Sequence, residues 1–116
     1  MQKYLTPLVA VLALLSPGLL WADTAAKPTD PQIAHIAYTA GLIDVEAGKL
    51  ALEKSKDKDV RAFAQRMVGD HTAVNDQALA LVKKLNVTPE DNPTSQSLTK
   101  QAETARKELA DLTGAA

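Results

Sequence analysis

The feature that most constrains this chain is a helical spacing of apolar residues, which recurs in consecutive segments separated by short polar breaks. The first segment runs from about Pro31 to Ser55, and Asp30 followed by Pro31 is a helix-start signal. The run Lys56-Asp57-Lys58-Asp59 interrupts the pattern. Asp57 or Asp59 can cap a second helix that ends near Leu85, so the two segments predict a long helical hairpin.

A third helix is expected after a loop that covers residues 86–93, because this stretch holds Pro89, Asn92 and Pro93. Thr94 or Ser95 can cap this helix, which then extends to about Leu112. Its apolar residues form one narrow seam: Leu98, Ala102, Ala105, Leu109 and Leu112. The alternation typical of a β-strand is absent from the sequence, and the predicted fold class is therefore all-α.

The N-terminal segment predicts a secretory signal peptide over residues 1–22. Lys3 is followed by an uncharged stretch from Leu5 to Leu20, which ends at Trp21-Ala22-Asp23. We expect cleavage after Ala22, with Ala25 or Ala26 as alternatives. Prolines interrupt the stretch, which argues against a membrane span. The expected organisation is then a signal peptide, a flexible leader over residues 23–29 and a helical domain over residues 30–116, exported to the periplasm or outer envelope of a bacterium.

Composition excludes several classes of function. The net charge of -1 creates no field that would gather nucleic acid. The chain has no cysteine, which removes disulfides, thiolate metal sites and thiol nucleophiles. Glycine-rich phosphate loops and serine-nucleophile motifs are also missing. The sequence therefore identifies no catalytic or cofactor-binding residue and leans away from an enzyme.

Asp44 lies in the middle of an otherwise apolar face of the first predicted helix. Small neighbours surround it, which predicts a seam where a partner helix approaches closely. The face consists of Ile33, Ile36, Ala37, Ala40, Ile43, Ala47 and Ala51. The second helix has His71 near the centre of its apolar face and Asp70 at the edge. That face consists of Val60, Phe63, Ala64, Met67, Val74, Ala78, Leu81 and Leu85.

Asp44 and His71 are expected to meet inside the bundle, because one precedes the turn near residue 57 by about as many residues as the other follows it. A carboxylate among alanines is costly to bury, and a histidine partner keeps it charged and hydrogen-bonded. The pair can be structural, half of a metal site or an acid/base pair. Two ligands are too few for tight binding of a transition metal. His35, on the polar side beside Thr39 and Glu46, is expected at the surface.

The sequence resembles the bacterial family called domain of unknown function 4142. The resemblance covers about residues 31–114 and is carried by two runs: Asp44-Val45-Glu46-Ala47-Gly48-Lys49-Leu50-Ala51 and Val60-Arg61-Ala62-Phe63-Ala64-Gln65-Arg66-Met67-Val68-Gly69-Asp70-His71-Thr72. It implies a ferritin-like bundle exported to the envelope, with no established activity or cofactor. The di-iron proteins of that fold use a Glu-x-x-His spacing, and here Val68 stands three residues before His71.

Two departures from the family pattern affect the expected site. Asp44 stands where members often carry glutamate, and similar proteins continue past Gly114 into a further helix that bears an aspartate and a histidine. The resemblance thus implies an incomplete fourth helix, either because the chain is truncated or because a homodimer completes the four-helix bundle.

The sequence predicts an exported ferritin-like module that is metal-associated or stress-related, with Asp44, His71 and Asp70 as candidate ligands of a divalent metal ion. The alternative is a structural or protein-interaction bundle in which Asp44 and His71 form a buried hydrogen-bonded pair.

Overall fold

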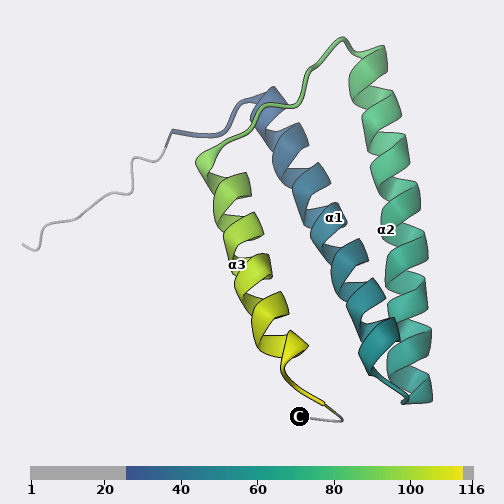
Figure 1. Ribbon diagram of the computed structural model, residues 1–116. Coiled ribbons are helices and arrows are strands. Elements are labelled where there is room, and N and C mark those ends of the chain that lie inside the picture. Colours follow the sequence, from purple (N-terminus) through teal and green to yellow (C-terminus); the bar gives the residue numbers. More distant parts are fainter. Residues whose placement is uncertain (1–25, 114–116) are drawn as a thin grey trace, which may run out of the picture.

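The computed structural model describes residues 26–113, which form three α-helices (Figure 1). These are α1 (Asp30–Lys54), α2 (Lys58–Lys84) and α3 (Pro93–Ala110). The described residues contain no β-strand, so the all-α prediction is confirmed. The predicted signal peptide and the first residues of the leader lie outside the described part of the chain. Within that part, no helix is long and apolar enough to span a membrane.

The starts of α1 and α3 are shifted from their predicted positions because different residues cap them. Thr29, not Asp30, caps α1, and its hydroxyl accepts a hydrogen bond from the Gln32 backbone while the Gln32 side chain accepts one from the Thr29 backbone. This reciprocal arrangement is a capping box. Asn92 caps α3 in place of Thr94 or Ser95, because its side-chain oxygen accepts from the Ser95 backbone. Asp57 caps α2, as one of the two predicted alternatives.

The C-terminal ends of α1 and α3 are also satisfied by side chains from neighbouring segments. Arg61 donates from α2 to the carbonyls of Leu52 and Ser55 and so closes the hairpin. Lys54 at the end of α1 donates to the carbonyls of Ala110 and Leu112, 2.6 and 3.1 Å away. These bonds fill acceptors that a helix C-terminus leaves free. Asn86 ends the α2 segment with a φ of 55°, in the left-handed region that asparagine tolerates.

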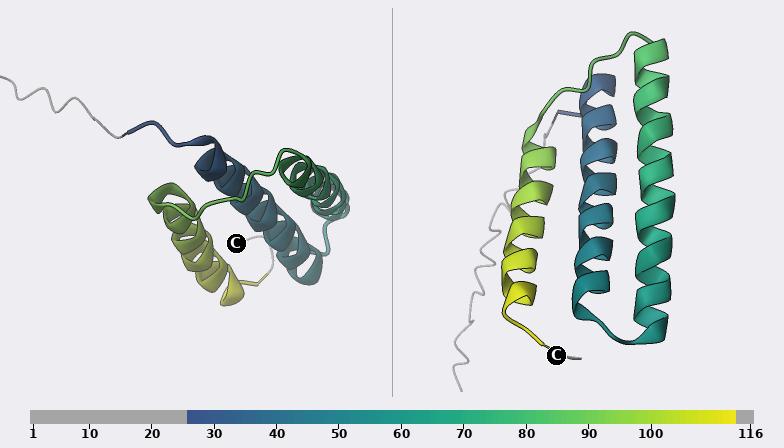
Figure 2. Two further views of the ribbon diagram at one scale, coloured as in Figure 1. Left: turned by 90° about the horizontal axis from the view of Figure 1, so that it is seen from above. Right: turned by 45° about the vertical axis from the view of Figure 1, so that its right-hand side comes forward.

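Helix α1 lies between the other two helices (Figures 1 and 2). It contacts both α2 and α3, whereas α2 and α3 do not contact each other. The hairpin turn makes α2 antiparallel to α1. The loop after α2 then crosses the start of α1, where the Glu90 backbone donates to the Pro31 carbonyl. As a result, α3 runs parallel to α1, and both ends of the arrangement are tied to the central helix.

Glycines set the contact between α1 and α2. Gly41 and Gly48 are buried on α1 together with Val45, and all three are one or two helical turns apart. A Cβ atom at Gly48 would lie 2.8 Å from Cγ2 of Val68 and 3.0 Å from the Ala64 carbonyl oxygen. The two backbones therefore approach closely at this face, which is not the alanine seam that the sequence predicted.

Asn75 fills the space that Gly41 leaves. The side chain of Asn75 is 6% exposed, and its oxygen would lie 2.1 Å from a Cβ atom at Gly41. The Asn75 side-chain nitrogen is buried and has no hydrogen-bond partner among the described residues. A polar side chain is thus held in the interface by shape, at the position where the opposite helix has no side chain.

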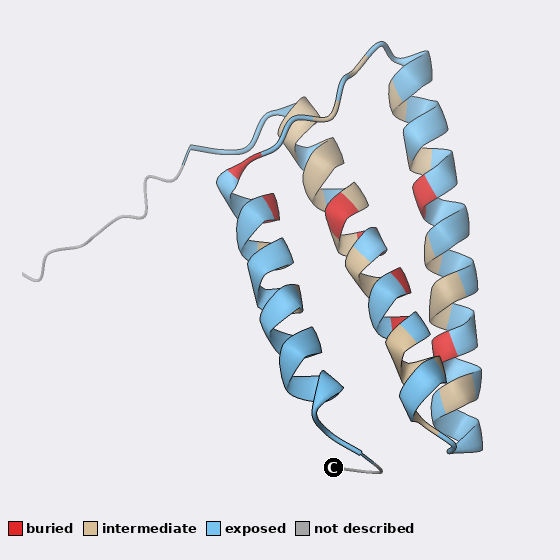
Figure 3. Ribbon diagram, viewed as in Figure 1, coloured by how far each residue is buried: buried red, intermediate tan, exposed pale blue. Residues whose placement is uncertain are grey.

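Much of the predicted core is exposed. Within the described residues only Val45 and Ala64 are buried hydrophobic residues, and pale blue covers most of the ribbon in Figure 3. The predicted core positions left substantially exposed are Ile33, Val60, Phe63, Val74, Leu81, Leu85, Leu109 and Leu112. Because α1 meets α2 through its glycine face, the larger apolar side chains of α2 are turned to one side of the contact.

We predict that Gly41→Ala lowers the free energy of unfolding by about 1–3 kcal/mol, because the added methyl group overlaps the Asn75 side chain. Gly69 is the matched control: a Cβ atom there meets nothing within 4 Å, so Gly69→Ala should raise the free energy of unfolding by about 0.5–1 kcal/mol. Urea unfolding of both variants checks this.

The cost of Gly41→Ala should fall in an Asn75→Ala background, where the overlapping side chain is gone. Equal costs in the two backgrounds would contradict the assigned contact.

Candidate functional site

The structure brings Asp44 and His71 together. The Oδ2 atom of Asp44 lies 3.5 Å from Nδ1 of His71, and the contact joins α1 to α2 near the middle of both helices. The predicted pairing of these residues is therefore confirmed. The distance is that of an ion pair at the outer limit of a hydrogen bond.

The expectation that this pair lies inside the bundle is wrong. The side chains of Asp44 and His71 are 43% and 33% exposed. The physical reason is the glycine contact: α2 packs on the Gly41, Val45 and Gly48 face, and Asp44 is rotated from the centre of the contact to its edge. Asp70 is exposed, and no ion pair or hydrogen bond among the described residues links it to the other two.

The pair lies on a surface that we call the open face. Helical spacing places its members on the same side of the α1–α2 contact. On α1 they are Ile33, Ala37, Ala40, Asp44, Ala47 and Ala51; on α2 they are Phe63, Met67, His71, Val74, Leu81 and Leu85. The α1 half is made mostly of alanines and the α2 half of large side chains. Phe63, Leu81 and Leu85 are 63%, 55% and 61% exposed.

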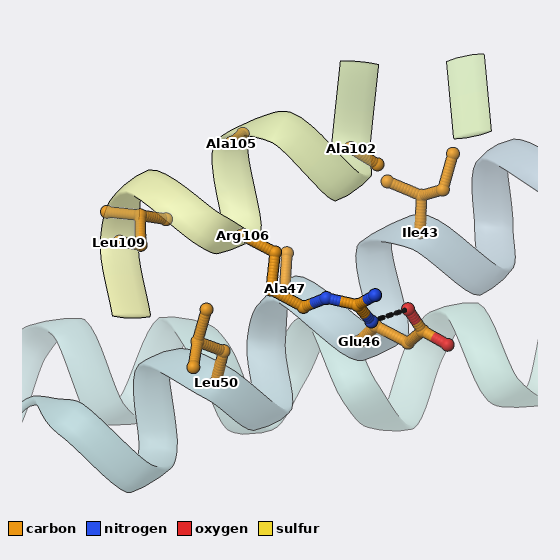
Figure 4. Close-up of a pocket in the computed structure, with 8 residues that line it drawn as sticks. All are labelled: Ile43, Glu46, Ala47, Leu50, Ala102, Ala105, Arg106 and Leu109. Carbon is orange, nitrogen blue, oxygen red and sulfur yellow. Dashed lines mark hydrogen bonds and ion pairs between the residues drawn. The ribbon is translucent and has the colours of Figure 1, made fainter. Parts of the chain in front are cut away.

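An apolar hollow lies next to the open face, between α1 and α3 (Figure 4). Small side chains leave this space, because Ala47 faces Ala102 and Ala105 there. An ion pair bridges the two helices at the polar edge of the hollow, where an Arg106 guanidinium nitrogen lies 3.2 Å from Oε2 of Glu46. The contact between α1 and the C-terminal part of α3 is thus loosely filled. The residues that line the hollow are Ile43, Glu46, Ala47, Leu50, Ala102, Ala105, Arg106 and Leu109.

His35 is partly buried, which corrects its expected place at the surface. Its Nδ1 atom lies 2.8 Å from the Ser95 hydroxyl and 3.9 Å from Oδ1 of Asp91, with the Thr39 hydroxyl 3.4 Å away. The sequence pattern predicts a solvated polar side for α1, but α3 and the loop before it pack on that side. His35 and Thr39 lie one turn apart on this polar side, and this pair is the sequence feature that could have indicated a polar partner there.

The His35 cluster has a structural role. Asn92 links it together, because its side-chain nitrogen donates to the Ser95 hydroxyl and to the carbonyls of Gln32 and Glu90. Serine, histidine and aspartate occur together here, as they do in hydrolases, but Ser95 is only 1% exposed. A substrate cannot reach its hydroxyl. The cluster fastens the start of α3 to the start of α1.

Asp91 at the rim of this cluster has a perturbed acidity. Hydrogen bonds from the Gln96 side chain and the Asn92 backbone hold the pKa of Asp91 below its ordinary value of 3.8, and the nearby His35 acts in the same direction. Such bonds favour the ionised carboxylate.

The described residues contain no cluster of three or more side chains that could hold a metal ion. Asp44 and His71 alone are a two-ligand set, open on one side.

The family model described as Domain of unknown function (DUF4142) matches residues 20–116. No curated protein and no solved structure matches the chain.

We predict that Asp91 stabilises the fold above pH 4 and loses this effect in acid. Its lowered pKa means that the folded state holds the carboxylate ionised where the unfolded state takes up a proton, so the contribution is present above pH 3.8 and disappears as pH falls further. Asp91→Asn should lower the urea midpoint at pH 7, and the gap from wild type should close as the pH falls below 3.8 toward the lowered pKa of Asp91 in the folded state. A gap that stays constant with pH would contradict this assignment.

Proposed function

The chain belongs to the family described as Domain of unknown function (DUF4142), and we propose that it is an exported helical module of the bacterial envelope that self-associates through its open face. The observation that carries the proposal is the uncovered row of large apolar side chains on α2. A soluble monomer rarely leaves such a contiguous apolar surface in water. The export half of the proposal is supported by the uncharged N-terminal stretch after Lys3.

A second copy of the chain fits this surface because the two halves of the open face are complementary. The α2 half forms a ridge of large side chains, among them Phe63, Val74 and Leu81. The α1 half beside it carries small side chains, among them Ala40 and Ala51. In a two-fold dimer the same surface meets itself, so the large side chains of each copy lie against the alanines of the partner copy. Two hairpins joined in this way make a four-helix bundle.

Energetics favour this arrangement over an uncovered hairpin. Full burial of a leucine or phenylalanine side chain contributes about 1.5–3 kcal/mol, and the ridge offers several that are more than half exposed. The net charge of -1 opposes the approach of two copies only weakly. The hollow between α1 and α3 opens beside Ala47, which gives the partner's large side chains further space.

Metal association is the second candidate function, and the contact between Asp44 and His71 favours it. Carboxylate oxygen and imidazole nitrogen are both common ligands of divalent transition metals. The partial exposure of both side chains leaves them accessible from the open face. The alternative is that the pair only fixes the register of α1 on α2, in which case its loss lowers stability and changes no ligand affinity.

We predict that the exported chain is a dimer and that Phe63→Asp converts it to a monomer, because the charge would have to be buried at the contact. Size-exclusion chromatography with light scattering measures the mass of both. Leu42→Asp is the matched control, since Leu42 is 42% exposed on α1 but lies on the opposite side of the α1–α2 contact.

The control variant should remain dimeric. A wild-type monomer at all accessible concentrations would overturn the proposed function, as would equal disruption by Phe63→Asp and Leu42→Asp.

A further inference from the structure

We propose that two copies of the chain hold one divalent transition-metal ion between them, with Asp44 and His71 of each copy as its four ligands. The proposal rests on the proposed self-association, because one copy supplies only two ligands and the described residues offer no third. It assigns to the middle of the open face a binding site that exists only in the dimer.

The position of the pair is the first argument. The α1 half of the open face runs from Ile33 to Ala51, and the α2 half runs from Phe63 to Leu85. Asp44 and His71 lie near the midpoints of these two stretches. A two-fold dimer that covers the whole face has its axis at the centre of that face. The pair of one copy therefore faces the same pair of the other across the axis.

The geometry of the pair is the second argument. Zinc binds imidazole nitrogen and carboxylate oxygen at about 2.0–2.2 Å in a tetrahedron, which separates adjacent ligand atoms by about 3.3–3.5 Å. The Asp44 Oδ2 and His71 Nδ1 atoms are 3.5 Å apart. One copy thus already holds two ligand atoms at the spacing of a tetrahedral edge. Rotation about the axis supplies the opposite edge, and two carboxylates with two imidazoles complete a coordination shell.

Charge is the third argument. Dimerisation brings two Asp44 carboxylates toward each other while the surrounding alanines and large apolar side chains exclude water. Uncompensated carboxylates in such a place oppose association. A divalent cation between them cancels both charges, so the metal and the dimer should stabilise each other. Among divalent ions, the nitrogen and oxygen ligand set favours zinc and its neighbours over magnesium or calcium.

Native mass spectrometry of the exported chain, titrated with Zn²⁺, tests the proposal. We expect one zinc ion per dimer and none on the monomer. Removal of zinc with a chelator should weaken dimerisation at least about tenfold, since coupling of this kind commonly reaches that size. His71→Gln retains a polar partner for Asp44 and supplies a poor metal ligand, so zinc affinity should fall at least about 100-fold while circular dichroism stays helical.

Asp76→Asn is the control for the ligand set, because Asp76 is an exposed carboxylate on α2 that helical spacing places on the side away from the open face. It should bind zinc as wild type does, and loss of binding in this variant would overturn the ligand assignment. Zinc bound to the monomer, or equal binding by wild type and His71→Gln, would also overturn the inference. A dimer that is indifferent to zinc would overturn the shared site and leave the self-association intact, whereas a chain that stays monomeric and binds no zinc throughout the titration would end both.

Discussion

The close approach of α1 and α2 at Gly41 and Gly48 is the constraint from which the rest of the arrangement follows. Without side chains at these positions, the α1 backbone contacts Val68 and Asn75 of α2 directly. This contact fixes the rotation of both helices about their axes. The alanines of α1 and the large apolar residues of α2 are then turned to the same side, and Asp44 meets His71 at the edge of the contact.

The contacts made by α1 differ in how completely they are filled. One part is held by hydrogen bonds, whereas the other leaves apolar side chains and space uncovered. At the start of α3, His35, Ser95 and Asn92 form a dense hydrogen-bonded cluster. Farther along, alanines leave a hollow that the Glu46–Arg106 pair only bridges. On the other side of α1, the hairpin is closed by Arg61 but its apolar ridge is uncovered. A partner that binds the open face would cover these exposed apolar side chains.

The helices and the Asp44–His71 contact could be predicted from the sequence, because both depend on local spacing and on the length of a tight turn. The depth of the contact could not, and the pair lies at the edge of the helix–helix contact instead of inside the bundle. The apolar pattern favoured the alanine seam as the helix–helix contact, whereas burial of backbone at glycine is a stronger determinant of how closely two helices pack. The spacing of apolar residues gives no information about glycine, so it does not predict that Gly41 and Gly48 are buried in the contact.

The His35 cluster was beyond the same reasoning for a different reason. Its partners lie about sixty residues away, and the loop that crosses the start of α1 decides which side of α1 receives α3. A polar face can be solvated or can receive a polar partner, and one helix alone does not distinguish these cases. Association through the open face depends in the same way on a surface that forms only when α1 and α2 have packed, so the spacing of residues in one helix does not predict it.

Intermolecular paramagnetic broadening can show whether two copies of the chain meet at the open face. The chain has no cysteine, so Ala40→Cys provides a single attachment site for a nitroxide on the open face. Spin-labelled chain is mixed with isotope-labelled chain that carries no nitroxide, and the NMR signals of the latter are compared with a sample whose label is reduced. We predict strong broadening on α1 and α2 around Asp44 and His71, and little in the outer part of α3. Broadening that is absent, or that is centred on α3, would contradict the account.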